Sequence, residues 1–338
     1  RQMETVLDEV DYLNLFDTDS EAHARLAESV ASVKAVCNST TTRIAANTLD
    51  AQARTGSVRQ TESESQRLPL RTLCGDIQFL TMPSPSLLIV PARFKSGKLY
   101  SQVPTSGTGD FTVTRATAAT RVGPDGLIAS VASGIPRLDY YTSGGTAGCP
   151  ALLVEPAGTN LALHSEAFNT TWSPVQLLAF NSGSVINTTG TLDPYGTNVA
   201  DLIVPNTTLN QHRLDQTTVS ASGSYTFSVF VKRAGYDFAR LRIGLAGASF
   251  NLASGTITAT DSGIVSAIQS YGNDWYRCIV SKAVSAANEV IRINVGDSAL
   301  VPDFQGNGTS GLYVFGAQYE TGSVATSYIP TTTAAVTR

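Results

Sequence analysis

Alternation of apolar and polar residues with a period of two constrains the C-terminal part of this chain more than any other feature. Three runs show it, Ser224–Lys232, Phe238–Leu245 and Val290–Val295. Because successive side chains of a strand point to opposite faces of a sheet, each run predicts a strand with one apolar face turned to a core. The residues predicted to face inward are Tyr225, Phe227, Val229, Val231, Ala239, Leu241, Ile243, Leu245, Ile291, Ile293 and Val295.

Turn signals separate these runs, for example Ala234-Gly235 and Tyr271-Gly272-Asn273. Short apolar or alternating runs recur in this way from about residue 86 onward. The pattern predicts a mostly β chain in which residues 111–338 form an antiparallel jelly roll or β-sandwich. No strand pattern alternates with a helical one there, which disfavours a parallel α/β sheet.

The N-terminal region has a different composition and predicts an N-terminal helical arm over residues 1–67. Residues 20–66 contain one Gly and no Pro, and apolar residues recur there at alternating steps of four and three, diluted by polar positions. This spacing fits a coiled-coil-like stalk, although a single amphipathic helix packed on a neighbour explains it as well. The apolar run Val6–Phe16 is a candidate docking segment. Prolines at 69, 83, 85 and 91 end the helical pattern, so residues 68–110 are predicted to be an extended connector with the first strand.

Charge and composition exclude several classes of function. The formal net charge is -4 without a long run of Lys or Arg, so we expect no nucleic-acid partner. No apolar stretch reaches the length of a membrane span, so none is expected. The four cysteines and three histidines are not spaced as metal ligands, and no phosphate-binding or dinucleotide-binding motif occurs. We therefore expect no metal and no cofactor.

An ordered series of sequence blocks resembles a known family over about residues 85–338. The blocks are GKLYSQVPTSGTGDFTVTRATAATRV (Gly97–Val122), IPRLDYY (Ile135–Tyr141), CPALLVEPAGTNLALHSEAFNTTW (Cys149–Trp172), YTFSVFVK (Tyr225–Lys232), GNDWYRCIV (Gly272–Val280) and GAQYETGSVATSYIPTTTAAVTR (Gly316–Arg338). They resemble a module of tailed-bacteriophage fibre, collar and capsid-appendage proteins. The family is similar in fold to concanavalin A-like and carbohydrate-binding jelly rolls.

This resemblance implies a virion protein on the surface of a phage particle that attaches to host-surface glycans. It also implies a homo-oligomer, with a trimer expected, whose N-terminal segment docks on other virion proteins. A purely structural decoration protein without a ligand is the first alternative. Because no catalytic motif occurs, we expect no enzyme activity. A polysaccharide depolymerase remains the second alternative, since glycoside hydrolysis needs only two carboxylates, such as Asp201 with Asp215 or Glu155 with Glu166.

The polar faces of the predicted strands supply the candidate binding residues. Arg240, Arg242, Arg292 and Asn294 are predicted to converge on one outer face, with Phe238 or Tyr236 as an aromatic ring. Anionic glycans would suit the arginines best. The alternative is that this face pairs with another subunit or meets water. Glu155 and Asn160, in contrast, are expected to tie loops down by binding backbone groups.

Overall fold

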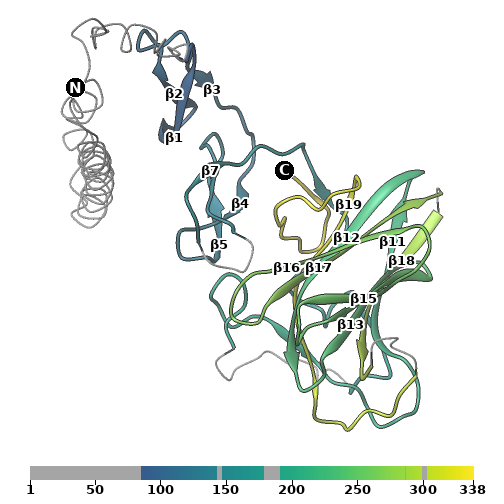
Figure 1. The fold of residues 1–338 in the computed structure, drawn as a ribbon. Coiled ribbons are helices and arrows are strands. Elements are labelled where there is room, and N and C mark those ends of the chain that lie inside the picture. The colour runs from purple at the N-terminus through teal and green to yellow at the C-terminus, as the bar shows by residue number, and fades with distance from the viewer. Residues whose placement is uncertain (1–84, 143–146, 179–190, 286, 299–302) are drawn as a thin grey trace, which may run out of the picture. The chain divides into compact units, whose positions relative to one another are not determined.

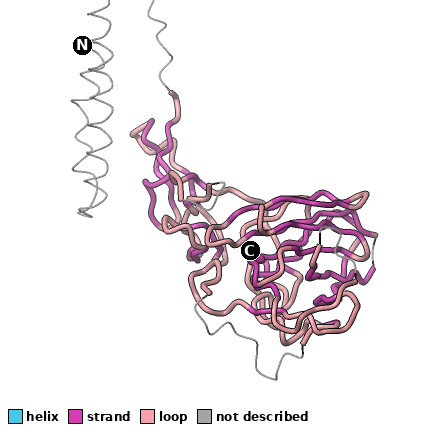
Figure 2. The backbone as a smooth tube through the Cα atoms, turned by 60° about the horizontal axis from the view of Figure 1, so that its bottom comes forward, coloured by secondary structure: helices cyan, strands magenta, loops and turns pink. Residues whose placement is uncertain are grey.

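The computed structural model describes residues 85–142, 147–178, 191–285, 287–298 and 303–338. The chain divides into two compact units, Arg1–Met82 and Pro83–Arg338, and the described residues belong to the second. The predicted helical arm of residues 1–67 lies outside them. Within the described ranges there is no α-helix, as Figure 2 shows, and therefore no helix that could cross a membrane.

All regular elements of the described part are β-strands (Figure 1). They are β1 (Leu88–Lys95), β2 (Lys98–Val103), β3 (Phe111–Thr112), β4 (Ala119–Val122), β5 (Ile128–Val131), β6 (Leu138–Asp139), β7 (Ala151–Leu152), β8 (Thr159–Asn160), β9 (Ser173–Val175), β10 (Asp201–Ile203), β11 (His212–Ser220), β12 (Gly223–Ala234), β13 (Phe238–Ile243), β14 (Ala246–Asn251), β15 (Thr256–Thr260), β16 (Ile264–Ser270), β17 (Tyr276–Val284), β18 (Ala287–Gly296), β19 (Gly311–Thr321) and β20 (Val336–Thr337).

Two large antiparallel sheets form the body of the unit. One has five strands in the order β10-β19-β12-β17-β16, and the other has six in the order β15-β14-β13-β18-β11-β9. Their facing side chains make one buried cluster, with Phe227 and Val229 from the five-stranded sheet and Leu241 and Ile293 from the six-stranded sheet. The two sheets therefore pack as a sandwich, and the prediction of antiparallel sheets around an apolar core is confirmed.

The three alternating runs correspond to β12, β13 and β18, and ten of their eleven predicted inward-facing residues are buried in this core. Leu245 is the exception, because β13 ends at Ile243 and Leu245 lies 83% exposed in the turn to β14. Gly244, with a φ of +64°, forms that turn. The strand therefore ends two residues before the end of the alternating run, at a glycine whose positive φ suits a turn.

The outer face of the five-stranded sheet is buried as well, which alternation did not predict. Alternation in the run Ser224–Lys232 puts Phe230 on the face opposite the core, with polar residues, yet its side chain is fully buried in a second cluster. That cluster comprises Ile128, Ala200, Phe230, Trp275, Phe315 and Tyr328. Gly316 permits the packing, because a Cβ there would lie 2.9 Å from the Phe230 ring. Segments before β10 and after β19 thus cover this sheet.

Smaller sheets make up the rest of the described part. β1, β2 and β3 form a three-stranded antiparallel sheet, while β4 pairs with β5, β6 with β7, and β8 with β20. The predicted connector of residues 68–110 contains β1 and β2. The third strand of their sheet, β3, begins at Phe111, just after the predicted connector ends. The pairing of β8 with β20 joins residues 159–160 to residues 336–337.

Candidate functional site

The outer face of the six-stranded sheet brings four of the six predicted site residues together. Arg240 and Arg242 lie on β13, and Arg292 and Asn294 lie on the neighbouring strand β18. The strand register places Arg240 opposite Asn294 and Arg242 opposite Arg292. The residues between them point into the core, so these four side chains project from the opposite face. We call this surface the arginine face.

Strand β11 extends the arginine face with two residues that the sequence reasoning missed. Arg213 pairs in register with Asn294, and Asp215 pairs with Arg292. The strand was hard to find because its inward-facing residues include His212, Gln216 and Thr218, which are polar although buried. The one usable signal was Leu214 between the two charged residues, and one apolar residue does not establish a period of two.

Two carboxylates compensate part of the positive charge on this face. The single Nε–H of Arg213 is shared by both carboxylate oxygens of Asp215, at 3.0 and 3.1 Å, and Oδ1 of Asp215 lies 3.6 Å from Nε of Arg292. Asp261, just after β15, accepts a bond from Nη2 of Arg240 at 2.5 Å. Four guanidinium groups therefore share two carboxylates, and the face carries an excess of positive charge.

Arg242 has the weakest compensation in the cluster. Its Nη1 donates to Oε1 of Gln211 at 3.4 Å, a long contact with a neutral acceptor. Burial, followed by the nearby positive charges of Arg240 and Arg292, holds the pKa of Arg242 below its usual value. For Asp261, burial is the largest influence and would raise the pKa, but the hydrogen bonds from Arg240 and from the backbone of Gly247, together with the nearby arginine charges, leave the pKa lowered. An additional anion at this face would relieve the repulsion among the arginines.

Asn294 lies at the centre of the face without a hydrogen-bond partner. Its side chain is fully buried, and neither Oδ1 nor Nδ2 has a partner among the described residues. Nε of Arg240 and Nε of Arg242 are also buried and unpaired there. A buried polar group left unsatisfied costs about 1–3 kcal/mol. The arginine face therefore contains buried hydrogen-bonding groups without partners among the described residues, which an ordered water can satisfy.

The two candidate aromatic residues lie in different places. Phe238 is the first residue of β13, is half-buried and shares the outer face with Arg240 and Arg242. Tyr236 lies in the connection from β12 to β13, where its ring packs on Phe304 at 5.2 Å between centroids and against the main core. Its hydroxyl accepts a hydrogen bond from the backbone N–H of Asn307 at 3.2 Å. Phe238 is thus the aromatic residue that accompanies the arginines.

The carboxylate pairs considered for hydrolysis are held in separate environments. Asp201 is buried on the inner side of the five-stranded sheet, accepts the N–H of Phe168 at 2.8 Å, and has its pKa raised to about 6 by burial. Asp215 lies on the outer face of the other sheet. Glu166 accepts the hydroxyl of Tyr328 at 3.0 Å, and burial raises its pKa.

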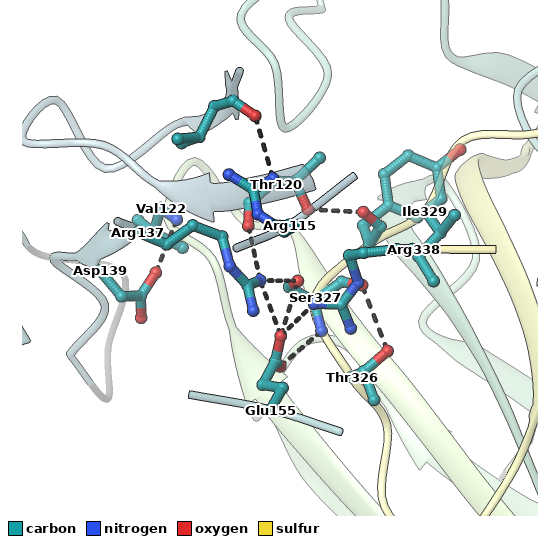
Figure 3. Close-up of polar contacts among 12 residues, drawn as sticks. Arg115, Thr120, Val122, Arg137, Asp139, Glu155, Thr326, Ser327, Ile329 and Arg338 are labelled. Carbon is teal, nitrogen blue, oxygen red and sulfur yellow. Dashed lines mark hydrogen bonds and ion pairs between the residues drawn. The ribbon is translucent and has the colours of Figure 1, made fainter. Parts of the chain in front are cut away.

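Glu155, the partner considered for Glu166, is the centre of an ion-pair cluster (Figure 3). Its Oε2 accepts bonds from Arg137 at 2.8 Å and from Arg338, and its Oε1 accepts the backbone N–H of Ser327 at 2.7 Å. Burial opposes ionisation of Glu155, but the charges and hydrogen bonds of Arg338 and Arg137 outweigh it and lower the pKa. These contacts join three distant segments, so the expectation that Glu155 ties loops down is confirmed.

Asn160 confirms the same expectation at a second position. Its Nδ2 donates to the carbonyls of Ala317 and Ile329 at 3.0 and 2.7 Å. Its Oδ1 accepts the N–H groups of Ala162 and Tyr319, each at 3.0 Å. Every hydrogen-bonding position of this buried amide is used, in contrast to Asn294.

Comparisons with known proteins give little further information. No protein-family model matches the chain, and no curated protein matches it. Among solved structures, the chain is similar to the enzymatically active domain of tailspike protein 4 from bacteriophage CBA120, with 12% sequence identity and a TM-score of 0.28. The match covers 47% of this chain and 21% of that chain. At so low a TM-score, the likeness carries no argument about function.

Proposed function

We propose that this chain is a subunit of a bacteriophage virion fibre or appendage that attaches to host-surface glycans and is not an enzyme. The ordered sequence blocks that resemble phage fibre and appendage proteins support the virion assignment and a location on the particle surface. The antiparallel sandwich supports the carbohydrate-binding jelly-roll module that the sequence resemblance implies. Host attachment then requires a binding surface, and the arginine face is the best candidate.

The observation that carries the proposal is the excess of positive charge on the arginine face. Its guanidinium groups exceed its carboxylates, and the buried amide of Asn294 has no partner among the described residues. A planar guanidinium binds a carboxylate or sulfate with two parallel hydrogen bonds. The ring of Phe238 can stack against the C–H groups of a sugar. An anionic glycan is therefore the ligand class that we propose.

Self-association is the second part of the proposal. A groove of about 600 Å³ has a largely apolar lining, made by Ile89, Pro91, Leu99 and residues 111–115, 135–137 and 152–155. Phe111 and Val154 in this groove are 50% and 80% exposed. Contiguous exposed apolar surface of this kind marks protein interfaces. We propose that further copies of the chain cover it in a homotrimer, with the N-terminal segment docking on other virion proteins.

Binding to a glycan array by the full chain tests attachment. We expect binding to acidic glycans, and we expect Arg242→Ala to weaken it about tenfold, because the least compensated charge is lost. Arg233→Ala is the matched control. Arg233 lies on β12, outside the arginine face, carries the same charge and pairs with Asp237. A chain that binds no glycan would favour the structural decoration alternative. Equal binding by both variants would exclude the arginine face as the site.

Light scattering of the full chain tests the oligomer, and a monodisperse monomer would contradict it. Release of reducing sugar from host polysaccharide tests the depolymerase alternative. We expect no release. Activity that disappears on substitution of a single carboxylate would overturn the proposal that the chain is not an enzyme.

A further inference from the structure

We propose that a second cavity, on the covered side of the five-stranded sheet, binds a single neutral sugar ring. The cavity has a volume of about 130 Å³. Its lining comes from β4, from residues 139–141, from β16 and β17, and from residues 325–328. The arginine face lies on the outer side of the other sheet, so this site is separate from it and goes beyond the proposed function.

Two tyrosines form an aromatic wall of the cavity. Tyr141 and Tyr271 have ring centroids 5.2 Å apart with an angle of 38° between the ring planes. Tyr271 packs edge-on against the buried ring of Phe230 at 4.8 Å, and its backbone N–H donates to the carbonyl of Trp275 at 2.8 Å. The wall is therefore fixed before a ligand arrives. Sugar rings stack their C–H faces on such aromatic surfaces.

Arg277 supplies a buried positive charge at the cavity. Its side chain is 2% exposed, and its Nε and Nη2 donate to the hydroxyl of Ser228 at 3.3 and 3.0 Å. The guanidinium also lies 5.3 Å from the ring centroid of Phe230. No carboxylate lies within ion-pair distance of it in the part of the chain that the structure describes. The guanidinium also hydrogen-bonds the Tyr271 hydroxyl. An arginine has five N–H donors, so the Ser228 and Tyr271 hydroxyls leave donors for a further acceptor.

Planar polar groups complete the lining. Asp139 uses Oδ1 to accept the N–H of Val122 at 2.7 Å, so Oδ2 can accept a ligand hydroxyl (Figure 3). Gln269 on β16 is half-buried and contributes an amide. Carboxylate, amide and guanidinium groups beside an aromatic ring are suited to the adjacent hydroxyls of a sugar.

Size and charge define the ligand class. Sites for drug-sized ligands measure about 300–1,000 Å³, so this cavity has room for one ring and not for an extended chain. The lining carries two guanidinium groups, Arg277 and Arg121, and two carboxylates, Asp139 and Glu155, of which Glu155 already pairs with arginines outside the lining. A neutral sugar can bond both to the guanidinium donors and to the free carboxylate oxygen of Asp139, whereas that carboxylate would repel the anion proposed for the arginine face.

Saturation-transfer NMR with the full chain tests the site. The probes are six free sugars at millimolar concentration, D-glucose, D-galactose, D-mannose, L-fucose, L-rhamnose and N-acetyl-D-glucosamine. We expect at least one to bind, and we expect Gln269→Ala and Tyr141→Ala each to raise its Kd about tenfold through loss of a hydrogen bond or of ring stacking. Thermal unfolding of each variant checks that it remains folded.

Arg242→Ala is the control that separates the two sites. It should leave binding of the neutral sugar unchanged while weakening binding of acidic glycans. Absence of binding by all six sugars, with only water filling the cavity, would overturn the inference and leave the proposed attachment function untouched. Equal affinity in wild type, Gln269→Ala and Tyr141→Ala would overturn it as well.

Discussion

The outer faces of the two large sheets differ in what lies on them. The five-stranded sheet is covered by other segments of the chain, with Phe230, Phe315 and Tyr328 buried between sheet and cover. The six-stranded sheet instead carries Arg242 and an unpartnered Asn294. Burial of aromatic rings stabilises the first face, whereas the second retains charge and unsatisfied hydrogen-bonding groups. One face thus serves stability, and the other has the properties of a binding surface.

The largest expected effect concerns the covered face. Phe230→Ala removes a fully buried ring from the cluster between sheet and cover, so we expect a loss of about 3–5 kcal/mol in the free energy of unfolding. Urea unfolding measures it. Val265→Ala on β16 of the same sheet is the control, since Val265 is 69% exposed and should change stability by no more than about 0.5 kcal/mol. If Phe230→Ala costs as little stability as Val265→Ala, the segments that cover the five-stranded sheet do not pack tightly on it.

Glu155 tests how the covering segments are attached. Glu155→Gln removes the partner of two arginines, Arg137 and Arg338, whose side chains are 6% and 4% exposed. We expect a loss of about 2 kcal/mol at pH 7, below the full value for a deeply buried pair because Glu155 keeps some exposure. The pKa of Glu155 is lowered in the folded state, so its contribution is present above its usual pKa. That contribution is lost as pH falls through the lowered value.

The difference in stability between wild type and Glu155→Gln should therefore shrink in acid. Urea unfolding between pH 7 and pH 3 measures the change. A difference that is independent of pH would show that the carboxylate is not the stabilising group.

Asn294→Leu tests the outer face of the six-stranded sheet. The change replaces an unpartnered buried amide by an apolar side chain of similar shape, so we expect stability to rise by about 1 kcal/mol. Binding of acidic glycans should weaken in the same variant. Asn160→Leu is the matched comparison, because that amide makes four hydrogen bonds and its loss should destabilise the fold. Destabilisation by both changes would mean that Asn294 is hydrogen-bonded in solution.

The smallest expected effect is that of Arg233→Ala. Arg233 and Asp237 form an exposed pair, with side chains 42% and 48% accessible to solvent. Such pairs contribute about 0–1 kcal/mol. We expect no measurable change in glycan binding and a change in stability at the low end of that range. A larger effect on binding would extend the proposed site beyond the arginine face.

The sequence predicted the strands and the convergence of the arginines because both follow from local alternation. Arg240, Arg242, Arg292 and Asn294 share a face once β13 and β18 pair, and a period of two fixes which side chains point together. The pairing itself is non-local. Arg213 and Asp215 were missed because the inner face of β11 contains buried polar residues that hide the alternation.

The cover of the five-stranded sheet could not be predicted from local pattern. On its own face of β12, Phe230 stands between Ser228 and Lys232, so only its size and apolar character indicate that this face is buried. The cavity beside it joins Tyr141 to Tyr271, residues far apart in the chain, so no local spacing could indicate it. The predicted helical stalk within residues 20–66 lies outside the described residues and stays a prediction.

The long-range ties of the domain have a consequence for its synthesis. Thr120 bonds to the carbonyl of Tyr328, 208 positions later, and Asn160 bonds to that of Ile329, 169 positions later. Contacts that close such long loops form late in folding. While a ribosome is still making the chain, the segments around Thr120 and Asn160 must wait for residues near 330 to emerge. Until then the aromatic surface of the five-stranded sheet is open to solvent and to chaperones.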